Sequence, residues 1–352
     1  MTSEPRTLVF DRLTRPLREL RVSVTDRCNL RCAYCMPKAL FGADHAFMPR
    51  AELLSPPEIA RAVRAFVEFG VRKVRITGGE PLARGDLVEI IGALRGIAGI
   101  EDLAMISNGI GLDAAKATAL RDAGLDRLTI SLDALDDARF RRINGMNVPV
   151  ARVLSGIEAG EAAGFTPLKI NVVVRRGWND ADVLPIARRF HGSPHIVRFI
   201  EYMDVGTRNG WRLDEVVPAR EIVARIDAEL PLEPVARNRA GEVAKRWRYR
   251  DGGGEIGVIT SVTQPFCGDC NRARLSADGR MYNCLFAESG LDLRDPLRGA
   301  AHEGDQDDLA RLIRDRWQAR DDAYSEHRAE HGKFRNPPDE SAKRIEMSYI
   351  GG

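Results

Sequence analysis

The sequence predicts an α/β fold: a partial (βα)6 barrel of the TIM type, followed by a smaller C-terminal domain. Three observations support this prediction. Strand-like runs alternate with helix-like stretches over the first two thirds of the chain, polar and apolar residues alternate within those runs, and the pattern changes after about Pro231. Strands that alternate with helices form parallel βα units, whose right-handed crossovers curl them into a full or partial barrel. We therefore place the barrel at residues 1–230 and the second domain at residues 231–352.

The six predicted strands cover residues 20–25, 73–77, 103–107, 127–133, 168–174 and 196–202. Ser55 begins a helix as a capping box with Glu58, and prolines follow in its first turn. Glycine then ends a helix three times just before a strand, at Gly70, Gly124 and Gly164. The repeated order of helix, glycine and strand is typical of βα units.

The predicted strands carry polar residues on one face, whereas a parallel sheet buried on both faces is almost continuously apolar. These polar residues are Arg21, Ser23, Thr25, Arg75, Thr77, Thr129, Ser131, Asp133, Lys169 and Asn171. The residues between them, Val22, Val24, Val74, Ile76, Ile130, Leu132 and Ile170, would pack against helices. Edge strands with a wet face are an open alternative. A ligand-filled interior is the better interpretation, because buried charges need partners.

The C-terminal part has a different pattern. It contains a basic stretch at residues 237–250, a glycine turn at 251–254, a second cysteine group, an amphipathic helix around 309–320 and a tail that ends in Gly351 and Gly352. We interpret it as a separate, smaller domain.

Composition excludes several classes of protein. The net charge of +2 over 352 residues is too balanced for a general nucleic-acid binder. No apolar run is long enough to span a bilayer, and residues 1–10 lack the apolar region of a secretory signal. We therefore expect a cytoplasmic protein, where structural disulfides are rare. The six cysteines need another explanation, and metal binding is the leading one.

The first cysteine group, Cys28, Cys32 and Cys35, directly follows the first predicted strand. Three thiolates can hold three irons of a [4Fe–4S] cluster and leave the fourth iron open to a small molecule. The alternative is a zinc loop that His45 completes, although CxxxC spacing is less usual than CxxC for zinc. Tyr34, before the last cysteine, either lies over the cluster or its ligand or is a packing aromatic.

A Gly78-Gly79-Glu80-Pro81 turn follows the second predicted strand. The glycines let the backbone approach a ligand closely, and Glu80 can accept a hydrogen bond from an ammonium group. Such a turn is weak evidence alone. It gains weight at the carboxyl end of a barrel strand, next to the first cysteine loop.

The second cysteine group comprises Cys267, Cys270 and Cys284. One interpretation is a second cluster with an open iron, and the alternative is zinc completed by His302 or Asp269. Arg272 and Arg274 follow at alternate positions. Two guanidiniums there suit a phosphate or carboxylate, although they could also be surface charges.

Together these residues resemble the GTP 3′,8-cyclase family of radical S-adenosylmethionine (SAM) enzymes, which acts in molybdenum cofactor biosynthesis. The resemblance covers nearly the whole chain. It rests on segments 23–29, 35–37, 75–81, 131–133 and 199–204, on the second cysteine group and on the terminal diglycine. The first cysteine loop and the glycine turn are shared across radical SAM enzymes, whereas the C-terminal features are more specific.

The resemblance implies two [4Fe–4S] clusters, one on each cysteine group, with SAM bound at the first. It implies that SAM contacts Tyr34, Gly79, Glu80, Ser131 and Met203. It also implies that GTP contacts Arg21, Arg75, Ile106, Lys169, Arg272 and Arg274. Ile106 departs from the family pattern, where threonine is common, so a hydroxyl contact is lost there and only a backbone contact could persist.

The implied activity is that of a lyase. A 5′-deoxyadenosyl radical from SAM abstracts the ribose 3′ hydrogen of GTP, and the carbon radical attacks C8 of the guanine. Uptake of one electron and one proton then gives (8S)-3′,8-cyclo-7,8-dihydroguanosine 5′-triphosphate. The implied partners are an electron donor such as a flavodoxin or ferredoxin and the cyclic pyranopterin monophosphate synthase, which takes the product. No membrane or nucleic-acid partner is implied, and a homodimer is left open. Two other functions stay open: a radical SAM peptide-modifying enzyme with an auxiliary cluster, and a zinc-stabilised binding module.

Overall fold

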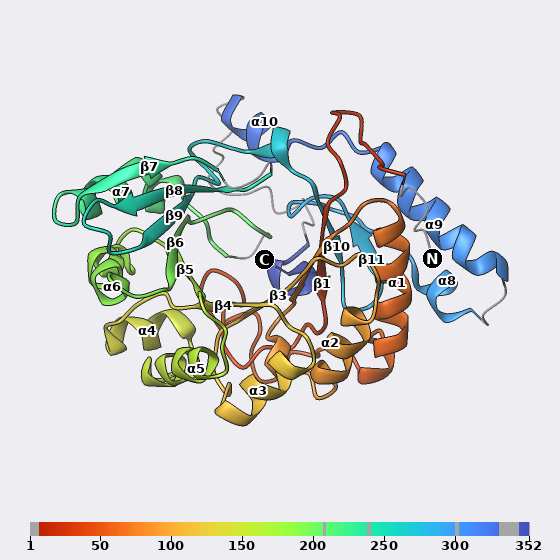
Figure 1. The fold of residues 1–352 in the computed structure, drawn as a ribbon, viewed down its shortest axis with the longest axis horizontal. Helices are drawn as coiled ribbons and strands as arrows, with labels where there is room; N and C mark the ends of the chain where they lie inside the picture. The colour runs from red at the N-terminus through yellow and green to blue at the C-terminus, as the bar shows by residue number, and fades with distance from the viewer. Residues whose placement is uncertain (1–6, 207–208, 238–240, 300–302, 331–344, 352) are drawn as a thin grey trace.

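Six parallel strands form the curved wall of the structure, a computed structural model that describes residues 7–206, 209–237, 241–299, 303–330 and 345–351. These strands are β1 (Glu19–Ser23), β2 (Lys73–Thr77), β3 (Asp102–Ser107), β4 (Arg127–Ser131), β5 (Lys169–Val174) and β6 (Ile196–Glu201), paired in chain order. Figure 1 shows them side by side around the centre of the molecule. Each predicted strand is present, with ends that differ by at most two residues from the prediction.

Helices cover the outside of this wall (Figure 1). They are α1 (Pro56–Glu68), α2 (Leu87–Arg95), α3 (Ala114–Asp122), α4 (Asp137–Asn144), α5 (Ala151–Ala162), α6 (Val183–Phe190) and α7 (Ala219–Asp227). The capping box at the start of α1 is confirmed, since the Glu58 carboxylate accepts from the backbone N–H of Ser55 at 2.6 Å. Gly70, Gly124 and Gly164 all have positive φ, as helix-ending glycines should.

The two faces of the strands differ in polarity, as the alternation predicts. Val22, Val74, Ile76, Ile130 and Ile170 are completely buried in the core between strands and helices. Arg21 and Arg75 instead line an interior cavity. The partial barrel is therefore packed on its helical side and polar on its inner side.

The C-terminal chain continues the same sheet at both edges. On one side β9 (Glu255–Ile259) pairs in parallel with β6, and β8 (Ala244–Tyr249) and β7 (Leu232–Val235) follow. On the other side β10 (Arg272–Leu275) pairs in parallel with β1, followed by β11 (Arg280–Tyr282) and β12 (Leu291–Asp292). Over the described residues the resulting sheet has 12 strands, and strands from the C-terminal chain lie at both of its ends. The boundary between residues 230 and 231 stays a prediction.

The described residues of the C-terminal chain also form helices α8 (Arg294–Arg298), α9 (Glu303–Gln318), α10 (Tyr324–Glu330) and α11 (Met347–Ile350). The amphipathic helix predicted around residues 309–320 corresponds to α9, which begins earlier and ends at Gln318. Helix α9 packs against α1 on the outside, whereas α11 contacts β1. In the described parts of the chain, no helix combines the length and the apolar character needed to cross a membrane.

Candidate functional site

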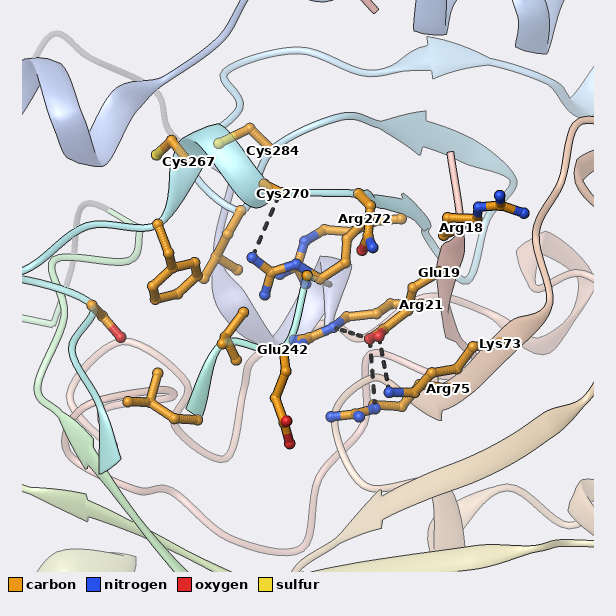
Figure 2. Close-up of a pocket in the computed structure, with 18 of the residues that line it drawn as sticks. Arg18, Glu19, Arg21, Lys73, Arg75, Glu242, Cys267, Cys270, Arg272 and Cys284 are labelled. Carbon is orange, nitrogen blue, oxygen red and sulfur yellow. Dashed lines mark hydrogen bonds and ion pairs between the residues drawn. The ribbon is translucent and has the colours of Figure 1, made fainter. Parts of the chain in front are cut away.

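A cavity of about 510 Å³ lies inside the barrel, between the inner face of the strands and the second cysteine group. Figure 2 shows this cavity, with arginines from β1, β2 and β10 and the three C-terminal cysteines around it. Its lining includes six residues predicted to bind GTP or SAM: Arg21, Arg75, Ile106, Met203, Arg272 and Arg274. Cys267, Cys270 and Cys284 line it as well. Sheet pairing thus brings together residues that lie far apart in sequence.

The register of the sheet aligns three guanidiniums across three neighbouring strands. Arg21 of β1 is paired with Arg274 of β10 on one side and with Arg75 of β2 on the other. Two residues earlier on each strand, Glu19 is paired with Arg272 on one side and with Lys73 on the other. Because residues two apart on a strand share a face, both rows point into the barrel.

The cavity carries an excess of buried positive charge. Burial and the nearby Arg274 and Arg75 lower the pKa of Arg21, and burial together with Arg272 lowers the pKa of Arg274 to about 10. The Nε atoms of Arg21, Arg75 and Arg198 are buried and have no hydrogen-bond partner among the described residues. Buried donors without partners are costly, so these atoms indicate a site for an anionic ligand.

Lys169 belongs to the same positive region, although it is not part of the cavity lining itself. Burial and the charges of Arg198, Arg127, Arg75 and Lys73 lower its pKa to about 6. At neutral pH the ligand-free site therefore holds this lysine largely uncharged, and an anion bound nearby would favour its protonation.

Glu19 provides a carboxylate in the middle of these cations (Figure 2). Its oxygens lie 3.0 Å from Lys73 Nζ, 3.6 Å from Arg21 Nε and 3.8 Å from Arg75 Nε. Burial acts to raise the pKa of Glu19, but Arg75, Lys73 and Arg21 outweigh it, so the pKa lies well below its usual value. Glu19, Lys73 and Arg198 are not among the site residues predicted from the sequence, although all three continue the same alternation along β1, β2 and β6.

The second cysteine group comes from two segments that meet at the cavity. Cys267 begins the 3₁₀ turn Cys267–Asp269, and Cys284 follows β11. Arg272 Nη2 lies 3.4 Å and Arg320 Nη2 3.3 Å from Cys270 Sγ. Although burial opposes the shift, these two arginines lower the pKa of Cys270 to about 6. Burial instead raises the pKa of Cys284 to about 12 and also raises that of Cys267.

The first cysteine group lies on the loop after β1. The backbone N–H groups of Cys35 and Met36 both donate to the carbonyl of Cys32 at 2.9 Å, which closes the turn between the last two cysteines. Burial raises the pKa of Cys28 to about 11 and raises those of Cys32 and Cys35 as well. Buried thiols of this kind become thiolates only beside strong positive charge, which iron ions supply.

The zinc alternatives find little support in the geometry. The ring of His45 packs against Phe41 and Phe47, and the carboxylate of Asp269 pairs with Arg237 at 2.7 Å. His302 lies outside the described residues. Within the described ranges, no three His, Cys, Asp or Glu side chains are gathered as a single metal ion requires. A [4Fe–4S] cluster needs its thiolates farther apart, because each of them binds a different iron.

The glycine turn after β2 packs directly on the backbone that leads into the first cysteine group. A Cβ atom on Gly79 would lie 2.2 Å from the carbonyl oxygen of Arg27, so a larger residue would push this loop away. Glu80 accepts hydrogen bonds from the backbone N–H groups of Leu82 and Asn108 at 2.9 and 2.7 Å, and from the Ser107 hydroxyl at 2.8 Å. Glu80 therefore joins the ends of β2 and β3, and its carboxylate has about one acceptor position left for a ligand.

The remaining residues predicted to contact SAM lie near the ends of β4 and β6. The hydroxyl of Tyr34 donates to Asp133 at 2.6 Å, and burial raises the pKa of this aspartate to about 6. Ser131 is the last residue of β4, and Met203 lies just after β6. Of the predicted SAM contacts, only Met203 also lines the cavity; Tyr34, Gly79, Glu80 and Ser131 do not. Asp133 was among the predicted inward-facing residues but not among the predicted site residues.

The C-terminal tail enters the barrel. Figure 1 shows α11, in dark blue, near the centre of the molecule beside β1. Ser23 donates to the backbone carbonyl of Tyr349 at 2.9 Å, and Arg274 donates to the carbonyl of Gly351. Gly351 has a φ of 71°, and a Cβ atom there would lie 2.1 Å from Thr77 Cγ2. Gly352 lies outside the described residues.

Two family models and several known proteins are similar to this chain. Residues 22–190 match the model of the radical SAM superfamily, and residues 195–326 match the model named Molybdenum Cofactor Synthesis C. The chain is 50% identical to a GTP 3′,8-cyclase of Acidothermus cellulolyticus, over 98% of this chain and 99% of the relative. It is 44% identical to a GTP 3′,8-cyclase of Staphylococcus carnosus, with the same shares covered.

A solved structure shows the same fold at low sequence identity. Streptococcus suis SuiB, in a crystal structure with S-adenosylmethionine bound, superposes with a TM-score of 0.60 at 14% identity. The match covers 85% of this chain and 68% of that chain.

Proposed function

The chain belongs to the GTP 3′,8-cyclase family of radical SAM enzymes, and on that premise we propose that it converts GTP into (8S)-3′,8-cyclo-7,8-dihydroguanosine 5′-triphosphate. This reaction is the first step of molybdenum cofactor biosynthesis. The observation that carries the proposal is the row of Arg274, Arg21 and Arg75, which lines one cavity together with three free cysteines. A nucleoside triphosphate offers the matching features, a polyanion at one end and a base that can bind iron at the other.

We propose that the two cysteine groups hold [4Fe–4S] clusters. Cys28, Cys32 and Cys35 would bind the first cluster, and Cys267, Cys270 and Cys284 the second. When bound, the clusters supply an electron for the cleavage of SAM and an open iron for the guanine. The residues fit these groups, because each triad leaves one iron free and the buried thiols need compensating positive charge.

The side chains around the cavity bind and orient the nucleotide in this proposal. Arg21, Arg75, Lys169, Arg272 and Arg274 hold the phosphates, and Ile106 packs beside the nucleotide as an apolar contact. Fixing the triphosphate leaves the ribose and base little freedom, which favours ring closure over other reactions of a radical. The cavity walls and the docked tail also keep water away from the reacting carbon.

Tyr34, Gly79, Glu80, Ser131 and Met203 would bind SAM. Met203 is suited to lie between the two ligands, because it follows β6 and also lines the nucleotide cavity. The hydrogen bond from Tyr34 to Asp133 would hold the tyrosine ring in place beside the first cysteine group.

We further propose that a flavodoxin or ferredoxin delivers the electrons and that the product passes to the cyclic pyranopterin monophosphate synthase. The cytoplasm suits this chemistry, because a reducing compartment keeps thiols unpaired, and all six cysteines are free in this structure. A homodimer stays a prediction.

Anaerobic incubation of the reconstituted protein with GTP, SAM and a reductant tests the proposed function. The cyclised product is an isomer of GTP, so chromatography must separate the two before mass analysis. The proposal predicts a new nucleotide of unchanged mass together with 5′-deoxyadenosine and methionine. Cleavage of SAM without any new nucleotide would contradict GTP as the substrate.

A further inference from the structure

Arg320 is a buried arginine that contacts the second cysteine group; it lines the same cavity but is not among the residues proposed to hold the phosphates. It follows α9 and is only 3% exposed. Its Nη2 donates to Cys270 Sγ at 3.3 Å and its Nη1 to the backbone carbonyl of Cys270 at 2.8 Å. One guanidinium thus holds both the sulfur and the backbone of the same cysteine.

Surrounding groups fix the position of this guanidinium. The Asp322 carboxylate accepts from Arg320 Nη2 at 3.1 Å, and the carboxylate of Asp11 lies 3.6 Å from Nη1. The Trp317 ring lies beneath the guanidinium, with its centroid 4.7 Å from Cζ. The backbone N–H of Arg12 donates to the carbonyl of Arg320 at 3.0 Å. The positive charge therefore stays beside Cys270 whether or not a nucleotide is bound.

Arg272 differs from Arg320 in this respect. It also donates to Cys270 Sγ, at 3.4 Å, but it comes from the sheet and belongs to the row of cations that would meet the triphosphate. Binding of a phosphate would draw its guanidinium away from the sulfur. Arg320 lines the same cavity, but its guanidinium is held in place, because its other donors are already bonded to Asp322 and to the Cys270 carbonyl.

Among the described residues, no guanidinium donates to the sulfur of the other two cysteines, and Cys267 has hydrogen bonds from the backbone of Ser325 and Glu326 instead. The buried Arg15 reaches Cys267, but its Nη1 donates to the backbone carbonyl at 2.9 Å. Cys284 Sγ accepts only a long contact of 3.5 Å from the backbone N–H of Phe286 in the described part of the chain. The triad is therefore asymmetric, with positive charge concentrated on one of its three sulfurs.

We propose that Arg320 is a positioning residue that sets the charge at the second cluster through Cys270 and thereby raises the reduction potential of that cluster. The inference rests on the proposed function, because it assumes that Cys267, Cys270 and Cys284 bind an iron–sulfur cluster. Hydrogen bonds to the sulfurs and nearby charge are two of the main determinants of cluster potential. A fixed cation favours the reduced state, because reduction adds a negative charge.

The test compares the midpoint potentials of the second cluster in the reconstituted full-length protein and its variants, by redox titration followed with electron paramagnetic resonance. The signal that changes when GTP is added identifies the second cluster. Arg320→Gln should shift its midpoint to a more negative value, while about four irons remain at each triad. Arg320→Lys keeps the charge but cannot bond to the Cys270 sulfur and carbonyl together. Its midpoint should therefore lie between those of the wild type and Arg320→Gln.

Arg12→Gln is the matched control. Arg12 lies next to Asp11, close to Arg320, but its side chain is exposed and pairs with Asp321 at 3.1 Å, so its loss should leave the midpoint unchanged. An unchanged midpoint in Arg320→Gln with both clusters present would overturn the inference. If Arg320→Gln loses the second cluster, the midpoint of Arg320→Lys is compared with that of the wild type, and an unchanged midpoint again overturns the inference. A wild-type protein without any second cluster would instead refute the proposed function.

Discussion

Ser23 donates a hydrogen bond to the backbone carbonyl of Tyr349 at 2.9 Å, although 326 residues separate the two in sequence. Ser23 ends β1 inside the barrel, so this bond fixes the C-terminal tail beside the proposed nucleotide site. Arg274 adds bonds to the carbonyls of Ile350 and Gly351. One arginine thus contacts the tail and is also proposed to hold the triphosphate, which couples the position of the tail to that of the substrate.

The tail should therefore affect ring closure more than binding. Gly351→Ala would place a Cβ atom against Thr77 and strain a backbone with φ of 71°. We expect both clusters and most of the GTP affinity to remain, while product formation falls by about a hundredfold, because small misplacements at a reacting centre cost large rate factors. Single-turnover assays and equilibrium binding measure the two effects separately.

Gly111→Ala controls for backbone strain alone. Gly111 also has a positive φ, of 85°, but a Cβ atom there would meet nothing within 4 Å. Its rate should stay close to wild type. A Gly351→Ala enzyme that cyclises GTP at the full rate would show that the tail is dispensable.

Glu19 should weaken the binding of polyphosphates. Its carboxylate lies among the cations proposed to hold the phosphates and repels any anion bound there. At an effective dielectric constant of about 20, removing this charge is worth on the order of 1 kcal/mol or more. Glu19→Gln should then bind GTP about tenfold more tightly by calorimetry, with a smaller gain for GDP and the smallest for GMP.

Glu101→Gln is the matched control for this charge series. Glu101 lines the same cavity, but its side chain is 64% exposed and pairs with Arg72, so solvent screens its charge.

Weaker binding of GTP by Glu19→Gln would contradict this prediction. It would mean that the Glu19 carboxylate acts chiefly by holding the cations in place.

GTP binding should be accompanied by proton uptake at Lys169. Burial and neighbouring cations lower its pKa to about 6, so at pH 8 the free site holds it neutral. A bound triphosphate raises this pKa, so the complex takes up nearly one proton at pH 8, where the phosphates are already ionised. GTP affinity should then fall as the pH rises above about 6.

Calorimetry in two buffers of different ionisation enthalpy counts the protons taken up. Lys169→Met should abolish most of the uptake and flatten the pH dependence. Proton uptake of the same size in that variant would assign the titration to another group.

The two cysteine groups should have separable roles. Cys28→Ala should abolish cleavage of SAM, because the first cluster is proposed as its electron source. Cys270→Ala should mainly impair GTP binding and cyclisation and leave some uncoupled cleavage of SAM. Formation of 5′-deoxyadenosine, measured with and without GTP, distinguishes the two variants. Wild-type GTP affinity in Cys270→Ala would refute the substrate role of the second group.

Alternation along the strands was enough to predict which side chains face the barrel interior. It placed Arg21 and Arg75 correctly, because the apolar residues next to each of them on the strand pack against helices. Lys73 and Arg198 follow the same alternation and could have been found by extending it. Glu19 was harder to find, because a single carboxylate at the start of a strand is ordinary until its neighbours are known.

Other features depended on contacts that no local pattern contains. The pairing of β10 with β1 puts Arg274 beside Arg21, yet nothing in either segment specifies that partner. Likewise, Arg320 follows a surface helix, and only the folded chain brings it to Cys270. The sequence therefore revealed the chemical groups, and the topology revealed which of them act together.

The central claim, that the chain cyclises GTP through a radical at the ribose 3′ carbon, is tested most directly with GTP that carries deuterium at that position. The reconstituted protein, SAM and a reductant should yield 5′-deoxyadenosine that contains the deuterium, and a cyclised nucleotide that has lost it. Deuterium retained in every nucleotide, with unlabelled 5′-deoxyadenosine, would contradict the account.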